Sequence, residues 1–172
     1  MSALPDCARG QAPRMAQPGE SEEDHRMSNG KNAGLDVGLL ILRLALGAIL
    51  IVHGYAKLTT IGPSGLADYL GNKLGILWPL PMAYACLLAE IGGGALVILG
   101  LFARIGALAI AVTMGVAIAK VHWPKGFFLK LKAEGLGDIP HGYEYCLALL
   151  AMALCIVFAG SGKIRVPVGK GP

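Results

Sequence analysis

The sequence predicts an all-α fold, an integral membrane protein built as an up-down four-helix bundle. Its 172 residues are 55% hydrophobic and only 15% charged, and the mean hydropathy is +0.60. Four apolar segments follow one another along the chain, joined by polar connectors. A soluble domain of this size rarely carries so many, so the lipid bilayer is the expected surrounding. The positive charges are spread over the connectors and form no basic stripe, which argues against nucleic acid as a partner.

Residues 1–33 are expected to form a separate, disordered tail. They are polar, rich in Pro, Gly and Glu, and contain no apolar run of the kind that forms a signal peptide. Met27 begins an ordinary lead-in to a first span and is an alternative start. We therefore expect a helical membrane domain over residues 34–166, followed by a short tail over residues 167–172.

Each apolar segment approaches the roughly 20 residues that a helix needs to cross a bilayer. The expected spans are Leu35–Tyr55, Leu80–Leu101, Ile105–Val121 and Gly142–Phe158. A short helix over Pro63–Leu70 would lie along the membrane interface. The second and third spans are separated by only Phe102 and Ala103, which predicts a tight hairpin.

An up-down order of spans decides which ends share a membrane face. The end of the first span, the start of the second, the end of the third and the start of the fourth must lie together. The tyrosines and tryptophans gather near this face, as in an aromatic belt: Tyr55, Tyr69, Tyr84, Tyr143, Tyr145, Trp78 and Trp123. The opposite face, which holds both termini, has a slim excess of lysine and arginine, and this predicts cytoplasmic termini.

The middle of the second span carries a carboxylate, Glu90, followed by Gly92–Gly94. A charge at that depth costs about 2.5–3.5 kcal/mol, so Glu90 must face protein, water or a partner. The glycines would let another helix approach closely. Counting the helical rise places Arg43 at a similar depth, and we expect a buried Arg43–Glu90 pair. Such a pair would be either a proton or substrate relay, or a salt bridge that locks the first span to the second.

A second polar group is expected at the aromatic face. His53 and Lys57 are four residues apart and share a helical face beside Gly54, and His122 and Glu144 flank the second connector. Together they would line a polar mouth suited to proton-coupled redox chemistry or to capture of a quinone head or a small anion. The structural alternative is an ordinary wet interface, in which Lys57 extends to the headgroups and His53 caps a backbone group.

The cysteines give a weaker signal. Cys86 and Cys146 lie at comparable depth and would form a redox dithiol if their helices adjoin, although a buried cysteine is usually inert. The chain has no CxxC, zinc spacing, phosphate loop, or haem or iron–sulfur ligand set. We therefore expect no metal and no bound cofactor.

The order of these motifs resembles the DoxX family of four-helix bacterial membrane proteins. The matching residues are Arg43-Leu44 with Gly47, His53-Gly54 with Lys57-Leu58, Ala89 to Gly94, Leu99 to Arg104, His122, and Gly142-Tyr143-Glu144. The resemblance covers about Leu35 to Val166.

The resemblance implies a multi-pass component of an oxidoreductase system in the bacterial inner membrane. It nominates six residues of interest: Arg43, His53, Lys57, Glu90, His122 and Glu144. We hypothesise that Glu90, His53 and His122 are catalytic groups and that Arg43, Lys57 and Glu144 bind the substrate. The resulting hypothesis is a quinone-linked oxidoreductase subunit acting on a small quinone, thiol or sulfur substrate, with quinone as substrate rather than bound cofactor. The alternatives are a non-catalytic membrane anchor for a soluble oxidoreductase, or a carrier of a small solute or anion.

Overall fold

A computed structural model describes residues 20–128 and 142–166, with side chains from Ala33 onward. These residues form helices and turns and contain no β-strand, so the expected all-α fold is confirmed. The chain divides into two units, Met1–Ala33 and Gly34–Pro172. The contacts reported below lie within the second unit.

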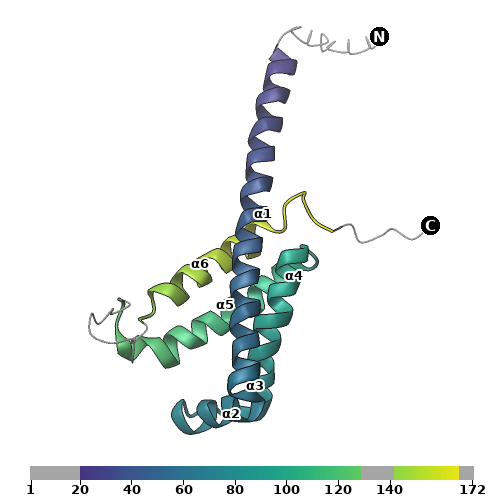
Figure 1. Cartoon of the computed structure of the whole chain (residues 1–172). Helices are drawn as coiled ribbons and strands as arrows, with labels where there is room; N and C mark the ends of the chain where they lie inside the picture. The colour runs from purple at the N-terminus through teal and green to yellow at the C-terminus, as the bar shows by residue number, and fades with distance from the viewer. Residues whose placement is uncertain (1–19, 129–141, 167–172) are drawn as a thin grey trace, which may run out of the picture. The chain divides into compact units, whose positions relative to one another are not determined.

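The described helices are α1 (Glu20–Thr60), α2 (Gly62–Asp68), α3 (Pro79–Leu87), α4 (Gly93–Leu99), α5 (Ala103–Ala117) and α6 (Glu144–Ala159) (Figure 1). Three π-helical turns and one 3-10 turn extend or connect them: η1 (Tyr69–Lys73), η2 (Leu88–Gly92), η3 (Ile118–His122) and η4 (Trp123–Lys125). The six described α-helices correspond to the four predicted spans and the short helix predicted in the first connector. The additional helix arises because η2 divides the second span into α3 and α4.

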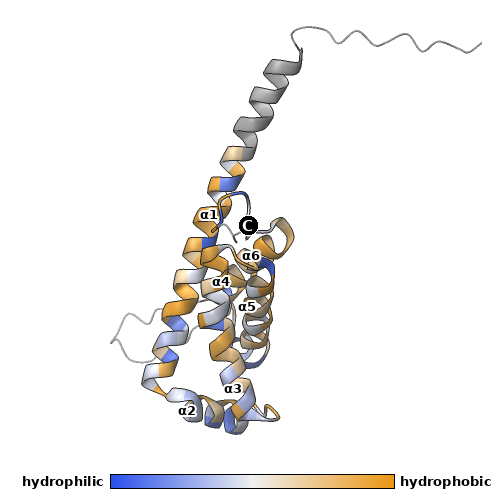
Figure 2. Cartoon of the chain, turned by 90° about the vertical axis from the view of Figure 1, so that its right-hand side faces the viewer, coloured by the Kyte–Doolittle hydropathy of each residue, from blue (hydrophilic) through white to orange (hydrophobic). Residues whose placement is uncertain are grey.

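Three helical stretches are long and apolar enough to cross a membrane. They are Ala33–Thr60, Pro79–Leu99 and Ala103–Lys125, with mean hydropathies of 2.4, 1.9 and 1.8. The fourth apolar segment, α6, has 16 residues, about 24 Å of helix, which is shorter than a hydrocarbon core of about 30 Å. Figure 2 shows hydrophobic residues along much of α1, α4 and α5. The four predicted spans are therefore present as helices, and α1 already begins at Glu20, inside the segment expected to lack structure.

The outward sides of these helices are apolar as well. Leu88, Ile105 and Phe158 are 73%, 63% and 78% exposed. Water would penalise such a surface, whereas lipid tails accommodate it. The distribution of apolar side chains thus agrees with a multi-pass membrane protein.

The main core lies where α5 meets its neighbours. The buried residues of α5 recur every three or four positions and are mostly small: Ala103, Gly106, Ala107, Ile110, Ala111 and Met114. Leu46 and Leu50 of α1, Val97 of α4 and Ile156 of α6 join the same cluster. A smaller core of Leu66, Ala67, Ala83 and Leu87 joins α2 to α3, so the short helix predicted in the first connector is confirmed.

Adjacent glycines on α4 face two different helices. A Cβ added at Gly93 would lie 3.1 Å from the carbonyl oxygen of Gly106 on α5. One added at Gly94 would lie 2.9 Å from the carbonyl oxygen of Gly47 on α1. The absence of side chains lets the backbones approach closely, as small residues do between membrane helices. The close approach expected at these glycines is confirmed.

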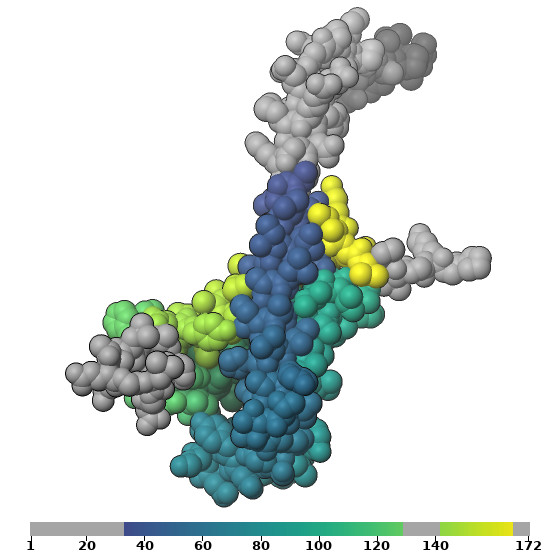
Figure 3. All heavy atoms as spheres, viewed as in Figure 1, coloured from purple at the N-terminus to yellow at the C-terminus, as the bar shows by residue number. Residues whose placement is uncertain are grey.

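Arg43 ties α1 to the end of α4 and to the segment after α6. Its Nε donates to the Val97 carbonyl at 2.8 Å, and its Nη2 to the Ile98 carbonyl at 2.7 Å. Its Nη1 donates to the carbonyls of Ser161 and Ile164 at 2.7 and 2.6 Å. Figure 3 shows this last segment, in yellow, against α1 and beside α4. Arg43, 1% exposed, thus donates to carbonyls at the end of one helix and in an irregular segment.

Substituting Gly94→Ala should lower stability by about 1–3 kcal/mol, because the added methyl group overlaps the backbone of α1. Gly115→Ala is the matched control, since a Cβ there has no neighbour within 4 Å, and it should be neutral or slightly stabilising. Thermal unfolding in detergent would measure both. Equal tolerance of the two substitutions would contradict the close packing of α1 on α4.

Substituting Arg43→Lys should destabilise the protein by about 2 kcal/mol, because lysine keeps the charge but cannot bond four carbonyls and leaves buried acceptors unpaired. Arg104→Lys is the control, since Arg104 makes one long 3.4 Å bond to the Phe158 carbonyl at an exposed position. The measurement is the unfolding midpoint of each variant. An unchanged midpoint for Arg43→Lys would show that the charge alone is required.

Candidate functional site

The polar centre of the membrane domain is an ion pair between α1 and η2. Lys57 Nζ donates to Glu90 Oε1. The Glu90 side chain is fully buried, and that of Lys57 is 30% exposed. Glu90 lies within the π-helical turn Leu88–Gly92, a departure from α-helix that is frequent at functional sites. The pair therefore connects a buried carboxylate to a cation that reaches the surface.

The prediction of an Arg43–Glu90 pair is wrong, and the register between α1 and η2 explains why. A Cβ at Gly54 would lie 3.1 Å from Glu90 Cβ, so Gly54 is the residue of α1 opposite the carboxylate. Arg43 is about 16 Å away from that level along α1. Lys57, less than one turn beyond Gly54, is the cation within reach. The prediction failed because it placed Lys57 at the level of the start of the second span instead of the level of Glu90.

A thiol accompanies the ion pair. Cys86 Sγ lies 3.8 Å from Glu90 Oε1, one helical turn earlier on α3. The four-residue spacing was visible in the sequence and could have identified this neighbour. Cys86 and Cys146 are both free thiols in the structure, so they form no disulfide there.

The second oxygen of Glu90 has different surroundings from the first. Oε2 is buried and has no hydrogen-bond partner among the described residues. A buried carboxylate oxygen normally accepts a hydrogen bond, because desolvation without one is unfavourable. The arrangement thus provides one oxygen held by Lys57 and a second that would accept a donor from a bound molecule.

His53 lies away from this pair, on the exposed surface of α1. Its ring is 6.4 Å from the ring of Tyr145, centroid to centroid, at an angle of 38°. Tyr145 belongs to the first turn of α6. Although His53 and Lys57 are four residues apart, His53 contacts α6 and Lys57 reaches η2.

His122 and Glu144 lie at the two ends of the second connector, which aromatic packing brings together. Trp123 stacks on Tyr143 with ring centroids 5.5 Å apart and an angle of 17°. The Glu144 backbone N–H donates to the Phe127 carbonyl at 3.2 Å. His122 ends η3 and Glu144 begins α6, and both are half-buried. The end of the third span therefore meets the start of the fourth, as the topology predicted.

The six candidate residues thus separate into three places. Lys57 and Glu90 form the buried pair, Arg43 binds backbone carbonyls at the opposite end of the helices, and His53, His122 and Glu144 accompany the aromatic residues near the start of α6. Within residues 20–128 and 142–166, histidine, cysteine and acidic side chains form no group of three or more that could hold a metal ion.

Comparison with known proteins assigns the chain to a family. The DoxX family profile matches residues 38–123. A Bacillus subtilis protein named "Putative oxidoreductase CatD" is 34% identical over 123 residues, which cover 72% of this chain and 82% of that protein. An "Uncharacterized protein" of Haemophilus influenzae is 31% identical over 128 residues, covering 72% and 84%. No solved structure matches the chain. The matched region holds Arg43, Lys57 and Glu90, and the chain belongs to the DoxX family.

Proposed function

We propose that this protein is the quinone-facing membrane subunit of a redox system, and that the Lys57–Glu90 pair is where a quinone or quinol exchanges protons. Family membership and a relative named as an oxidoreductase support a membrane protein associated with redox chemistry. The observation that carries the finer proposal is Glu90 Oε2, which is buried and has no partner in the described part of the chain. A quinol hydroxyl is a donor of the type that this oxygen lacks.

The proposed step is a proton transfer coupled to oxidation of the quinol. A quinol becomes a quinone by losing two protons and two electrons. Glu90 would accept a hydroxyl proton at Oε2 while Lys57 holds Oε1, release it to water, and then accept the second hydroxyl proton in the same way. The electrons would pass to a separate, soluble oxidoreductase. Since Lys57 is 30% exposed, it would connect the carboxylate to water at the membrane face.

The other candidates take different parts in this proposal. His53, His122 and Glu144, near the start of α6, would exchange protons with water. Arg43 takes a structural part, because its guanidinium is already occupied by four backbone carbonyls.

We also propose a place for the protein in the bacterial inner membrane, with both termini in the cytoplasm. Both relatives are bacterial. Arg104, Lys163 and Arg165 gather at the end of the helices that leads to the C-terminus, and a positive cytoplasmic side is the usual orientation signal.

Substituting Glu90→Gln should reduce quinol oxidation about 10²-fold or more, because the amide keeps the shape of the side chain but cannot take a proton. The assay follows the absorbance of a reduced quinone analogue added to the protein in lipid vesicles, with a water-soluble electron acceptor. Asp68→Asn, at an exposed carboxylate on α2, is the control and should keep the wild-type rate. An unchanged rate in Glu90→Gln, or no oxidation by the wild type, would contradict the proposal.

Single and double substitutions of Lys57 and Glu90 test whether the pair transfers protons or only holds the two helices together. Lys57→Met should destabilise by about 2 kcal/mol, below the range for fully buried pairs because Lys57 is partly exposed. Lys57→Met combined with Glu90→Leu should recover most of that loss, since no buried charge remains. Unfolding midpoints measure these effects, and the quinol assay is then run on the double variant. Wild-type activity in a stable double variant would identify the pair as structural.

A further inference from the structure

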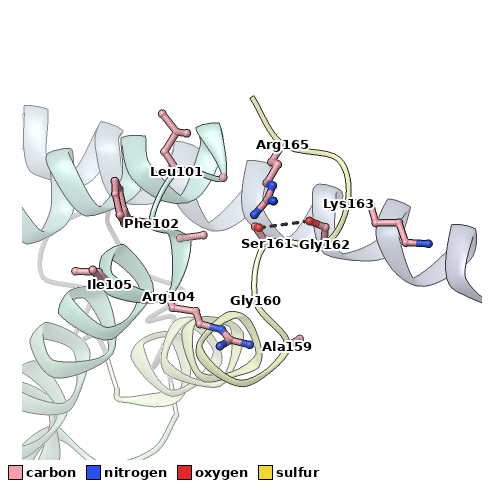
Figure 4. Close-up of a pocket in the computed structure, with 12 residues that line it drawn as sticks. Leu101, Phe102, Arg104, Ile105, Ala159, Gly160, Ser161, Gly162, Lys163 and Arg165 are labelled. Carbon is pink, nitrogen blue, oxygen red and sulfur yellow. Dashed lines mark hydrogen bonds between the residues drawn. The ribbon is translucent and has the colours of Figure 1, made fainter. Parts of the chain in front are cut away.

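A cavity lies at the end of the helices opposite the polar mouth. It has a volume of about 940 Å³ and is formed by the hairpin between α4 and α5 and by the segment after α6 (Figure 4). Its lining includes Phe102, Arg104, Ile105, Ser161, Lys163 and Arg165. None of the residues assigned to the proposed redox site lines it.

The charges that line the cavity are all positive. Arg104, Lys163 and Arg165 line it, and no acidic residue does. Figure 4 shows Arg104 and Arg165 on either side of Ser161, with the ammonium group of Lys163 pointing away from it. Asp36 is an acidic residue close to the segment after α6, and its Oδ1 accepts the backbone N–H of Lys163 at 2.9 Å. Within the described residues, none of the three cations forms an ion pair.

The buried guanidinium of Arg43, next to the cavity lining, adds to the positive potential in the cavity. Gly100 lines the cavity, and a Cβ placed there would overlap the guanidinium of Arg43 and lie 2.9 Å from Arg165 Cβ. The recorded partners of Arg43 are all neutral backbone carbonyls. Carbonyl dipoles stabilise a buried cation, but they do not neutralise it. An anion in the cavity would balance the charges of Arg43, Arg104 and Arg165 together.

The backbone at the cavity also favours an anion. Helix α5 is 15 residues long and begins at Ala103, and no side chain caps its first turn. Phe102, Ala103, Arg104 and Ile105 line the cavity, so the amino end of α5 borders it. The amino end of a helix carries unpaired N–H groups and a partial positive charge, to which phosphate groups bind readily.

The cavity has an apolar side as well. Phe102 and Ile105 are 72% and 63% exposed beside the arginines. A free anion would leave these side chains without a partner, whereas a lipid has acyl chains that would cover them. We propose that this cavity binds the phosphate headgroup of an anionic phospholipid, with Arg104 and Arg165 on the phosphate and the acyl chains along Phe102 and Ile105.

The test measures thermal unfolding of the delipidated full-length protein in detergent, through the fluorescence of Trp78 and Trp123. Phosphatidylglycerol is titrated, with phosphatidylcholine of the same acyl chains and inorganic phosphate as the other arms. The midpoint should rise with phosphatidylglycerol and much less with the other two. Arg104→Gln/Arg165→Gln should weaken the apparent affinity for phosphatidylglycerol about 25-fold, or fivefold per charge removed.

Lys120→Gln/Lys125→Gln is the matched control, because it removes two exposed cations from the other end of α5, and it should keep the wild-type affinity. If the double arginine variant is unstable, Arg165→Gln alone should still lose about fivefold. Equal stabilisation by phosphatidylcholine, or an unchanged affinity in Arg165→Gln, would overturn the proposal. A midpoint that rises with inorganic phosphate as much as with phosphatidylglycerol would support a phosphate site but overturn its assignment to a lipid.

Discussion

The buried side chain of Glu90, paired with Lys57, is the constraint on which the arrangement of the helices depends. It lies in a stretch, Pro79–Leu99, that is otherwise apolar enough to cross a membrane, and it is fully buried. Burying such a charge is unfavourable unless a cation is brought to it. Lys57 satisfies that requirement only if α1 lies directly against η2. Gly54 and Gly94 make this approach feasible, because neither presents a side chain to the opposite helix. The ion pair therefore depends on the close helix contacts at the glycines.

Arg43 and Lys57 of α1 bind different kinds of group, and their chemistry explains which residue stands at each position. Lys57 meets a single carboxylate, and a compact ammonium group on a flexible stem suits that contact. Arg43 meets four carbonyl oxygens that point at it from two segments. A planar guanidinium with several fixed donors matches such a set, and a lysine does not. Helix α1 is thus positioned by charge near its carboxyl end, at Lys57, and by hydrogen-bond geometry near its middle, at Arg43.

The sequence was sufficient for the spans, the hairpin, the short helix in the first connector and the close packing at Gly93 and Gly94, because hydropathy and residue size determine these directly. It was insufficient for the partner of Glu90. That partner depends on the register between α1 and the second span, which the first connector and the π-helical turn at Leu88–Gly92 set jointly. The hydrogen-bond acceptors of Arg43 could not be predicted from the sequence either, because every residue has a backbone carbonyl. The thiol of Cys86 was one turn from Glu90 and was overlooked.

The bonds of Arg43 can be completed only late in synthesis. The arginine emerges from the ribosome within the first hydrophobic helix, but two of its acceptors, Ser161 and Ile164, are translated 118 and 121 residues later. Until the last helix is released, the nascent chain holds a guanidinium with incomplete partners inside the membrane. A chain truncated before Ser161 would keep that defect permanently. In such a chain the part of α1 around Arg43 would have fewer bonds to its surroundings and would open more easily.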